Sequence, residues 1–502
     1  MPANPSGPGL RRTLGVWQAV GLSVALMAPS MAANINPQGT AMTVGRAVPL
    51  AFFLAAIGVL LVAYGFVRLC QYYQHAGSVY AFVGATLGPR TGLVSGWGLL
   101  GTYTFYGVVT ASAFGIFGTA FLDQIGVWPN PPTWAPFILI AVALVVAFLL
   151  TVAPVRRGTS VLLTVEGATV ALILLISAII LVRLVSGTAP SGQTFDLSVF
   201  SVAPGTELSA VFLGVVFGFL SFAGFEAAAT LGEETRDPKR DIPRAILGTA
   251  IFGGLYYVVV TAVEMMGFGT DQAGVDAFSN SPSLLGDLSA EYVGAWVGDI
   301  ITLGAAISAF GCCLACLVSG SRLLFALGRD AGGNRGVGQA SAAGTPANAA
   351  LVVVVGMAVI VLVSAVAFGA MPFDTFFWSG VIGTLILLVI YVLTTLGAIV
   401  LLFVQRKLPV PMWQVTIPIL ALVVLGYTIF RNVIPYPTSG AARWFPVVAG
   451  LWLLIGLVVA LARPALATRL GEGLTAAEGL SSGSAGYDVM NPPRVGRDTE
   501  RS

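Results

Sequence analysis

Long apolar runs dominate this chain and limit what it can fold into. Twelve mostly apolar stretches are separated by short segments rich in charge, glycine or proline. A helix of about 20 apolar residues is long enough to cross the hydrocarbon layer of a bilayer. The runs therefore predict an all-α membrane protein with 12 transmembrane helices, at approximate limits 14–36, 47–69, 92–121, 134–153, 160–185, 208–232, 244–268, 294–327, 349–369, 373–403, 412–430 and 444–463.

The composition argues against a soluble protein and against an enzyme. Of the 502 residues, 57% are hydrophobic and 9% are charged, whereas soluble domains are about 25% charged. The basic residues are scattered through loops, so the lipid bilayer is an expected partner and nucleic acid is not. His75 is the only histidine, and no Ser/His, Cys/His or metal-ligand constellation is present. We expect no catalytic residues, cofactor or metal.

Three of the four cysteines lie together in the apolar run 294–327. The spacing of Cys313 and Cys316 resembles a redox or zinc motif, but no second Cys/His pair accompanies it. Small thiols are also well suited to tight packing between helices. We therefore interpret these cysteines as buried packing residues.

The distribution of basic residues predicts the orientation. With the amino terminus placed in the cytoplasm, all 24 Lys and Arg residues fall on the cytoplasmic side except Arg46, Arg183, Arg431 and Arg443. This bias predicts an even number of spans with both termini cytoplasmic. Residues 1–13 and 464–502 are rich in Gly, Ser and charge and are expected to be disordered, which leaves 14–463 as the membrane domain. The first apolar run imitates a cleavable signal peptide, and we interpret it as an uncleaved first helix.

Two of the predicted spans are interrupted near their middles. Pro29 removes a helical hydrogen bond in the first span, and Gly224 weakens the sixth span at a comparable depth. Interrupted spans at matching places in two halves indicate the binding site of an inverted-repeat transporter. The spacing predicts two five-helix repeats plus two extra helices. The alternative is that Pro29 makes a simple kink and Gly224 is a packing residue.

Three glutamates fall inside predicted spans. A carboxylate within a span costs roughly 3 kcal/mol on insertion scales and usually faces a partner or a cavity. Glu226 lies beside the second interruption and just before a dense basic segment, so it is the leading functional candidate. Glu166 is interpreted either as a second protonatable group or as a residue near the cytoplasmic end that reaches water. Glu264 lies near the end of its span and is expected to be solvated.

Three segments resemble the amino acid–polyamine–organocation superfamily of permeases, in its bacterial amino acid permease branch. They are SFAGFEAAATLGEETRDPKRDIPRAI after Leu220, AGSVYAFVGATLGPRTGLVSGW from Ala76, and SRLLFALGRDAGGN from Ser321 with the later GTPANA. The resemblance implies the five-plus-five (LeuT-like) inverted-repeat fold and alternating access. It also implies a small-molecule substrate held at the two unwound segments, which here are Ala28, Pro29, Ser30 and Met31, and Phe222, Ala223, Gly224 and Phe225.

The resemblance gives Glu226 a role in proton coupling, but the chain departs from the family pattern twice. The first break reads Ala-Pro-Ser-Met-Ala where relatives often have a glycine-rich run, which leaves fewer bare glycine amides. Leu220 stands where some exchangers have an aromatic lid.

The first hypothesis is a proton-coupled amino acid symporter of the bacterial cytoplasmic membrane. The α-carboxylate would bind at Pro29 to Met31 and the α-ammonium at Phe222 to Phe225. Glu226 and Glu166 would be the proton-coupling groups. Phe373 and Trp378 are candidate gate residues, with an interfacial aromatic belt as the alternative. Polyamine or other organic-amine transport, amino acid exchange and sodium coupling through hydroxyls such as Ser308 stay open. A channel or a sensor is more distant.

Overall fold

The computed structural model describes residues 14–73, 78–153, 158–203, 205–232, 234–330, 336–341, 345–437 and 440–469. Within these ranges the regular structure is helical, and the only β-type pairing is an isolated bridge between Leu14 and Thr235. His75 and the predicted disordered ends 1–13 and 470–502 lie outside the described residues. Residues 464–469, which the sequence placed in the disordered tail, are helical.

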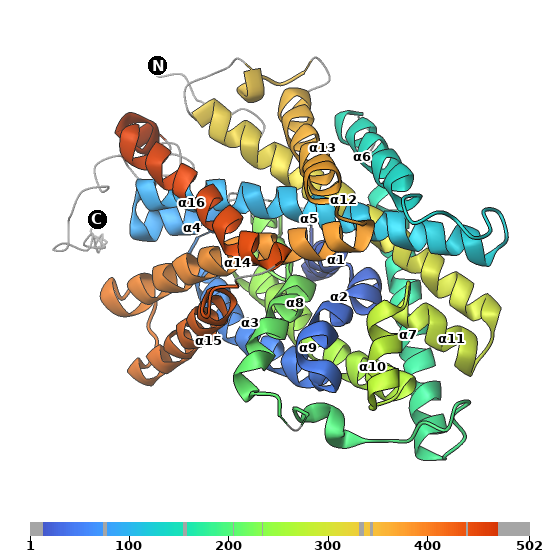
Figure 1. Ribbon diagram of the computed structural model, residues 1–502. Helices are drawn as coiled ribbons and strands as arrows, with labels where there is room; N and C mark the ends of the chain where they lie inside the picture. The colour runs from blue at the N-terminus through green and yellow to red at the C-terminus, as the bar shows by residue number, and fades with distance from the viewer. Residues whose placement is uncertain are drawn as a thin grey trace, which may run out of the picture.

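Sixteen α-helices account for most of the described chain (Figure 1). In order they are α1 (Val16–Met27), α2 (Pro29–Val44), α3 (Val48–Tyr72), α4 (Ser78–Leu87), α5 (Pro89–Gln124), α6 (Pro136–Val152), α7 (Gly158–Val185), α8 (Val211–Phe222), α9 (Pro238–Phe268), α10 (Gln272–Asn280), α11 (Leu284–Tyr292), α12 (Ala295–Asp330), α13 (Ala347–Phe368), α14 (Pro372–Ile399), α15 (Thr416–Val433) and α16 (Phe445–Ala462).

Each of the twelve apolar runs coincides with helix, so the protein is an all-helical, multi-pass membrane protein. Ten stretches of the described chain are long and apolar enough to span a bilayer. The first of these, Val16–Tyr72, covers the first two predicted spans, and the run 134–153 forms the 17-residue helix α6. The first predicted span, 14–36, ended too early, because α2 continues to Val44 through an internal Pro37. The count of twelve crossings and the placement of both termini stay predictions.

The margin of the bundle is apolar, as a lipid-facing surface requires. In α13, which has one of the highest mean hydropathies of the candidate spans, only 11% of the most apolar stretch is buried. Valines and leucines on α6, α13, α15 and α16 are exposed, and these helices lie toward the edge in Figure 1. In water such a surface would be an aggregation hazard, whereas in hydrocarbon it costs nothing.

Four of the five pairs of helices that lie five predicted spans apart pack against each other. The pairs are α2 with α8, α3 with α9, α5 with α12 and α6 with α13. A pseudo-two-fold axis in the membrane plane brings equivalent helices of two inverted repeats together in this way. The packing of these four pairs is consistent with the five-plus-five arrangement, which stays a prediction, as does the place of α15 and α16 as the two additional helices.

The short helices α10 and α11 pack against the middle of α2 and are here called the α10–α11 cap. Asn34 Oδ1 accepts hydrogen bonds from Ser283 Oγ (3.0 Å) and from the amide of Leu285 (2.9 Å), at the start of α11. Gln38 Nε2 donates to the backbone carbonyls of Phe278 and Ser281. All these groups are buried, so side chains of α2 supply the polar partners that hold the cap in place.

Candidate functional site

The first broken helix is interrupted at Ala28. α1 ends at Met27, Ala28 adopts a left-handed conformation (φ 43°, ψ 58°), and α2 begins at Pro29. Proline suits the first position of a helix because it has no amide hydrogen to leave unpaired there. The sequence therefore makes a complete break, with one helix ending and another beginning, and the simple-kink alternative is wrong.

The second broken helix is interrupted at Ala223 to Glu226. α8 ends at Phe222, Gly224 has a φ of +106°, and the chain resumes as a short 3₁₀ helix, Ala227–Leu231. Residues other than glycine rarely adopt such a φ. Because α1 and α8 both end here, their carboxyl-terminal ends place partial negative charge at the two breaks, which favours a cation nearby.

The two breaks touch each other. A Cβ atom added to Gly224 would lie 2.7 Å from Leu26 Cβ and 2.9 Å from the carbonyl carbon of Leu26. Ser23 Oγ of α1 donates to the carbonyl of Phe225 (3.0 Å) and accepts from the amide of Ala228 (3.1 Å). Two segments about 200 residues apart in the sequence thus form one continuous irregular region.

Two neighbouring tyrosines of α9 bind both breaks. Tyr257 Oη donates to the carbonyl of Ser221 (2.9 Å) and lies 3.5 Å from the carbonyl of Met27. Tyr256 Oη donates to the carbonyl of Pro29 (3.3 Å). Irregular backbone inside a membrane is tolerated only where protein or water satisfies it, and these phenols meet part of that need. Neither tyrosine was predicted from the sequence, because a tyrosine in an apolar run carries no signal of the partner it will find.

Glu166 lies at the amino end of α2. Its Oε1 accepts a hydrogen bond from the amide of Ser30 (2.9 Å), and the side chain is 5% exposed. Ser308 of α12 lies beside the carboxylate and accepts from the amide of Met31 (3.3 Å). The interpretation of Glu166 as a water-exposed residue near the cytoplasmic end is therefore wrong, since its carboxylate sits in the protein interior at the first break.

Glu226 lies at the second break. Its Oε2 accepts hydrogen bonds from the Tyr391 hydroxyl (3.1 Å) and from the amide of Gly224 (3.2 Å), and the side chain is 8% exposed. The ring of Tyr391 in turn packs edge to face against Phe66 and Phe225. The buried carboxylate is thus held by a single phenol of α14 and by backbone of its own segment.

Glu264 is a correction to the sequence analysis. The residue lies near the end of α9 as expected, but its side chain is fully buried. Neither carboxylate oxygen has a hydrogen-bond partner among the described residues. Burial follows from the packing of α9 against α7 and α11, shown one turn further on by Gly267 against Ile180 and Leu288. A position near the end of an apolar run therefore did not imply contact with water.

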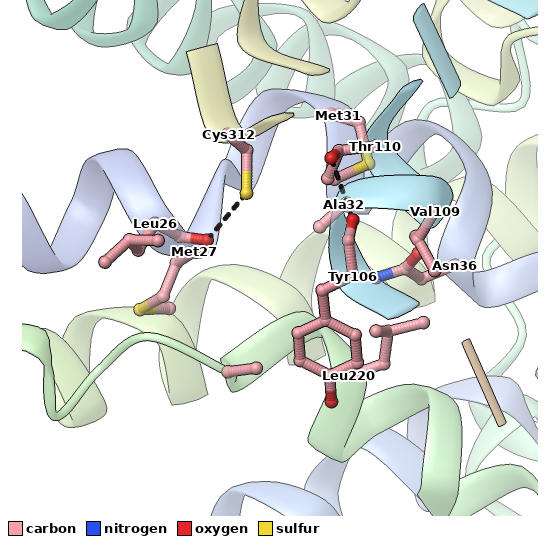
Figure 2. Close-up of a pocket in the computed structure, with 11 residues that line it drawn as sticks. Leu26, Met27, Met31, Ala32, Asn36, Tyr106, Val109, Thr110, Leu220 and Cys312 are labelled. Carbon is pink, nitrogen blue, oxygen red and sulfur yellow. Dashed lines mark hydrogen bonds between the residues drawn. The ribbon is translucent and has the colours of Figure 1, made fainter. Parts of the chain in front are cut away.

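A small cavity lies beside the breaks (Figure 2). Its volume is about 20 Å³, which is room for about one water molecule. It is lined by Leu26, Met27, Met31, Ala32, Asn36, Tyr106, Val109, Thr110, Leu220, Ala223 and Cys312. Figure 2 shows Cys312 directed at Leu26, and the Cys312 thiol donates a hydrogen bond to the Leu26 carbonyl (3.1 Å).

All four cysteines are free and buried, as the packing interpretation predicts.

The two predicted gate residues do not line this cavity. Trp378 packs against Phe368 of α13 and Phe445 of α16, and Phe373 packs against Phe377. Phe377 in turn lies edge to face with Phe217 of α8. A gate role for Phe373 and Trp378 stays a prediction. Met31 and Ala223 are the predicted substrate-binding residues that line the cavity, whereas Met27, Asn36, Tyr106 and Thr110 were missed.

Broken helices in contact, a buried cavity between them and carboxylates at each break define the class of protein as a membrane permease for small solutes. Comparison with known proteins agrees. The family model described as "Amino acid permease" matches residues 22–465. The chain belongs to the amino acid permease family.

Three relatives illustrate the range of that family. The chain is 28% identical over 331 residues to the low-affinity putrescine importer PlaP of Escherichia coli (strain K12), covering 65% of this chain and 69% of the relative. It is 30% identical over 323 residues to the uncharacterized transporter Rv1999c of Mycobacterium tuberculosis, covering 64% and 67%. It is 25% identical over 343 residues to the branched-chain amino acid permease BcaP of Lactococcus lactis, covering 67% and 70%.

Proposed function

We propose that this protein is a secondary active transporter that carries a small solute with an amino group across the bacterial cytoplasmic membrane. The solute binds at the two breaks, next to residues 28–31 and 222–225, and transport follows alternating access. The observation that carries the proposal is the direct contact between the breaks at Gly224 and Leu26. It brings the carboxyl ends of α1 and α8 to one point, where their dipoles attract an ammonium group.

Coupling to protons is the second part of the proposal, with Glu226 as the proton-carrying group and Glu166 as the second candidate. A buried carboxylate is costly when ionised without a partner, and Glu226 has one phenol and one amide. Protonation would weaken the hydrogen bond from Tyr391 of α14, because a neutral carboxyl group is a poorer acceptor than a carboxylate. Because α14 packs against α5 and α8, this change could reach both the scaffold and the broken helix. Exchange and sodium coupling are the competing modes.

The test is uptake into proteoliposomes with an imposed pH gradient. Glu226→Gln keeps an oxygen for Tyr391 but cannot exchange a proton, so we expect loss of gradient-driven accumulation with solute binding retained. Glu207→Gln, an exposed carboxylate whose partner is Ser209, is the matched control and should behave as wild type. Accumulation by Glu226→Gln at the wild-type rate would exclude Glu226 as the coupling group. Replacing sodium with choline separates proton from sodium coupling.

A further inference from the structure

The amino end of α2 has no free amide. A helix normally leaves its first N–H groups unpaired, which makes this end a natural anion site. Here Pro29 has no N–H, Ser30 donates to Glu166 (2.9 Å) and Met31 donates to Ser308 (3.3 Å). Ala32 donates back to the carbonyl of Ala28 (2.9 Å). The chain itself therefore occupies every backbone amide that a bound carboxylate would need at this end, and the Ser30 hydroxyl is the donor without a partner among the described residues.

The second break offers no replacement. The amides of Ala223 and Phe225 bond to the carbonyls of Leu220 and Phe222, and the amide of Gly224 donates to Glu226. Further on, Ala227 donates to the carbonyl of Gly224 and Ala228 to Ser23 Oγ. The residues lining the cavity include neither lysine nor arginine. A carboxylate entering this site would lose its water and gain neither a cationic side chain of the cavity lining nor one of the backbone amides named above, which is unfavourable.

Asn36 gives the cavity a free acceptor instead. The Ser221 hydroxyl donates to the carbonyl of Phe217 (2.9 Å), so toward Asn36 it can only accept. This fixes the Asn36 amide, whose Nδ2 donates to Ser221 Oγ (2.7 Å). Asn36 Oδ1 is then left buried without a partner among the described residues, on a side chain that lines the cavity. An unpaired buried acceptor is what an ammonium donor would satisfy.

We propose that Glu166 is a built-in carboxylate that fills the anion position at the amino end of α2, so that the pocket takes small organic amines lacking a carboxylate. The inference rests on the proposed transport function and names its substrate class. Glu166 and Glu226 each bind the amide next to a cavity residue, Met31 and Ala223 respectively. When ionised, both carboxylates also favour an ammonium and oppose a carboxylate.

The experiment compares amines with their α-carboxylated analogues in proteoliposomes containing the full-length protein. Putrescine is paired with ornithine, cadaverine with lysine, and 3-methylbutylamine with leucine, so each pair differs by one carboxylate. For at least one pair we expect wild-type uptake of the amine to exceed that of the amino acid at least tenfold. Equal or preferential uptake of the amino acid in every transported pair overturns the inference and leaves the transport function standing. Uptake of neither member of any pair overturns the proposed function.

Two variants of Glu166 test the mechanism. Glu166→Ala frees the amide of Ser30, so the ratio of amino acid to amine uptake should rise at least tenfold. Glu166→Gln still supplies an oxygen to that amide and should leave the amino acid excluded. Ser177→Ala, also buried on α7 and without a partner among the described residues, controls for general damage. An unchanged ratio in Glu166→Ala, in protein that still takes up the amine, contradicts the role of Glu166. If Glu166→Ala does not fold, the comparison of amine and amino acid uptake by the wild-type protein tests the proposed substrate class.

Discussion

Single residues set the geometry of this site, and they differ in how far the sequence predicted them. Pro29, Gly224 and Glu226 were predictable because each breaks a local rule inside an apolar run. Glu166 was ambiguous, because a carboxylate in a span can face water or a partner. Its actual partner, the amide of Ser30, lies 136 residues away. Local patterns hold no information about such a contact, so only the fold could identify it.

Gly224→Ala is the sharpest test at the residue scale. The new methyl group would lie 2.7 Å from Leu26 Cβ, at a φ that side chains rarely adopt. Strain and overpacking together should lower the free energy of unfolding by about 2–5 kcal/mol and abolish uptake. Thermal unfolding in detergent and proteoliposome uptake measure the two effects. Gly248→Ala, on α9 where the added methyl group would meet open space, should retain both stability and uptake. A stable, active Gly224→Ala would contradict the contact between the breaks.

At the scale of elements, the existence of helices was far easier to predict than their ends and partners. Each of the twelve runs contained helix, because about 20 apolar residues have no other stable form across a bilayer. The continuation of α2 to Val44 was missed, since residues 34–40 read as polar. These polar residues are buried because they bind the α10–α11 cap and α8. The polar composition of residues 34–40 therefore wrongly indicated the end of the helix, because these side chains bind other helices and not water.

Asn34→Leu tests that anchoring. The substitution preserves side-chain size but leaves Ser283 Oγ and the amide of Leu285 without their shared acceptor. Leaving such groups unpaired costs about 1–3 kcal/mol, so we expect a lower melting temperature. Faster hydrogen exchange should be confined to residues 281–292. Asn280→Leu makes the same change at an exposed position of the cap and should shift stability by less than about 0.5 kcal/mol. Equal exchange in both variants would show that Asn34 does not anchor the cap.

At the scale of the whole molecule, the structure is closed around its candidate site. A cavity of about 20 Å³ is far below the roughly 300 Å³ or more that ligand pockets usually have. Binding and release therefore require the bundle to open. The packing of helices five spans apart suggests where the bundle can divide, because each such pair joins one proposed repeat to the other.

Cys312 can report that opening. Its thiol lines the cavity and is 4% exposed, so a water-soluble maleimide should react slowly with the closed protein. A transported amine should change the rate at least severalfold, either by stabilising an open state or by shielding the thiol. Cys70→Ser, Cys313→Ser and Cys316→Ser together leave Cys312 as the single thiol for mass spectrometry. A rate that no transported solute alters would mean that this cavity is not part of the transport path.

The bridge between Leu14 and Thr235 affects which substitutions the bridge residues themselves can tolerate. The amide of Leu14 donates to the carbonyl of Glu234, and the amide of Arg236 donates to the carbonyl of Leu14. The segment leading into α1 is thereby tied to the segment that follows the second break. Both hydrogen bonds join main-chain groups, so they do not depend on the identity of the side chain at Leu14. Mutational scans should therefore tolerate most substitutions at Leu14, with proline as the exception, because proline has no amide hydrogen to donate. Thr235 should tolerate fewer, because it is fully buried and its hydroxyl donates to the carbonyl of Leu231 (2.8 Å).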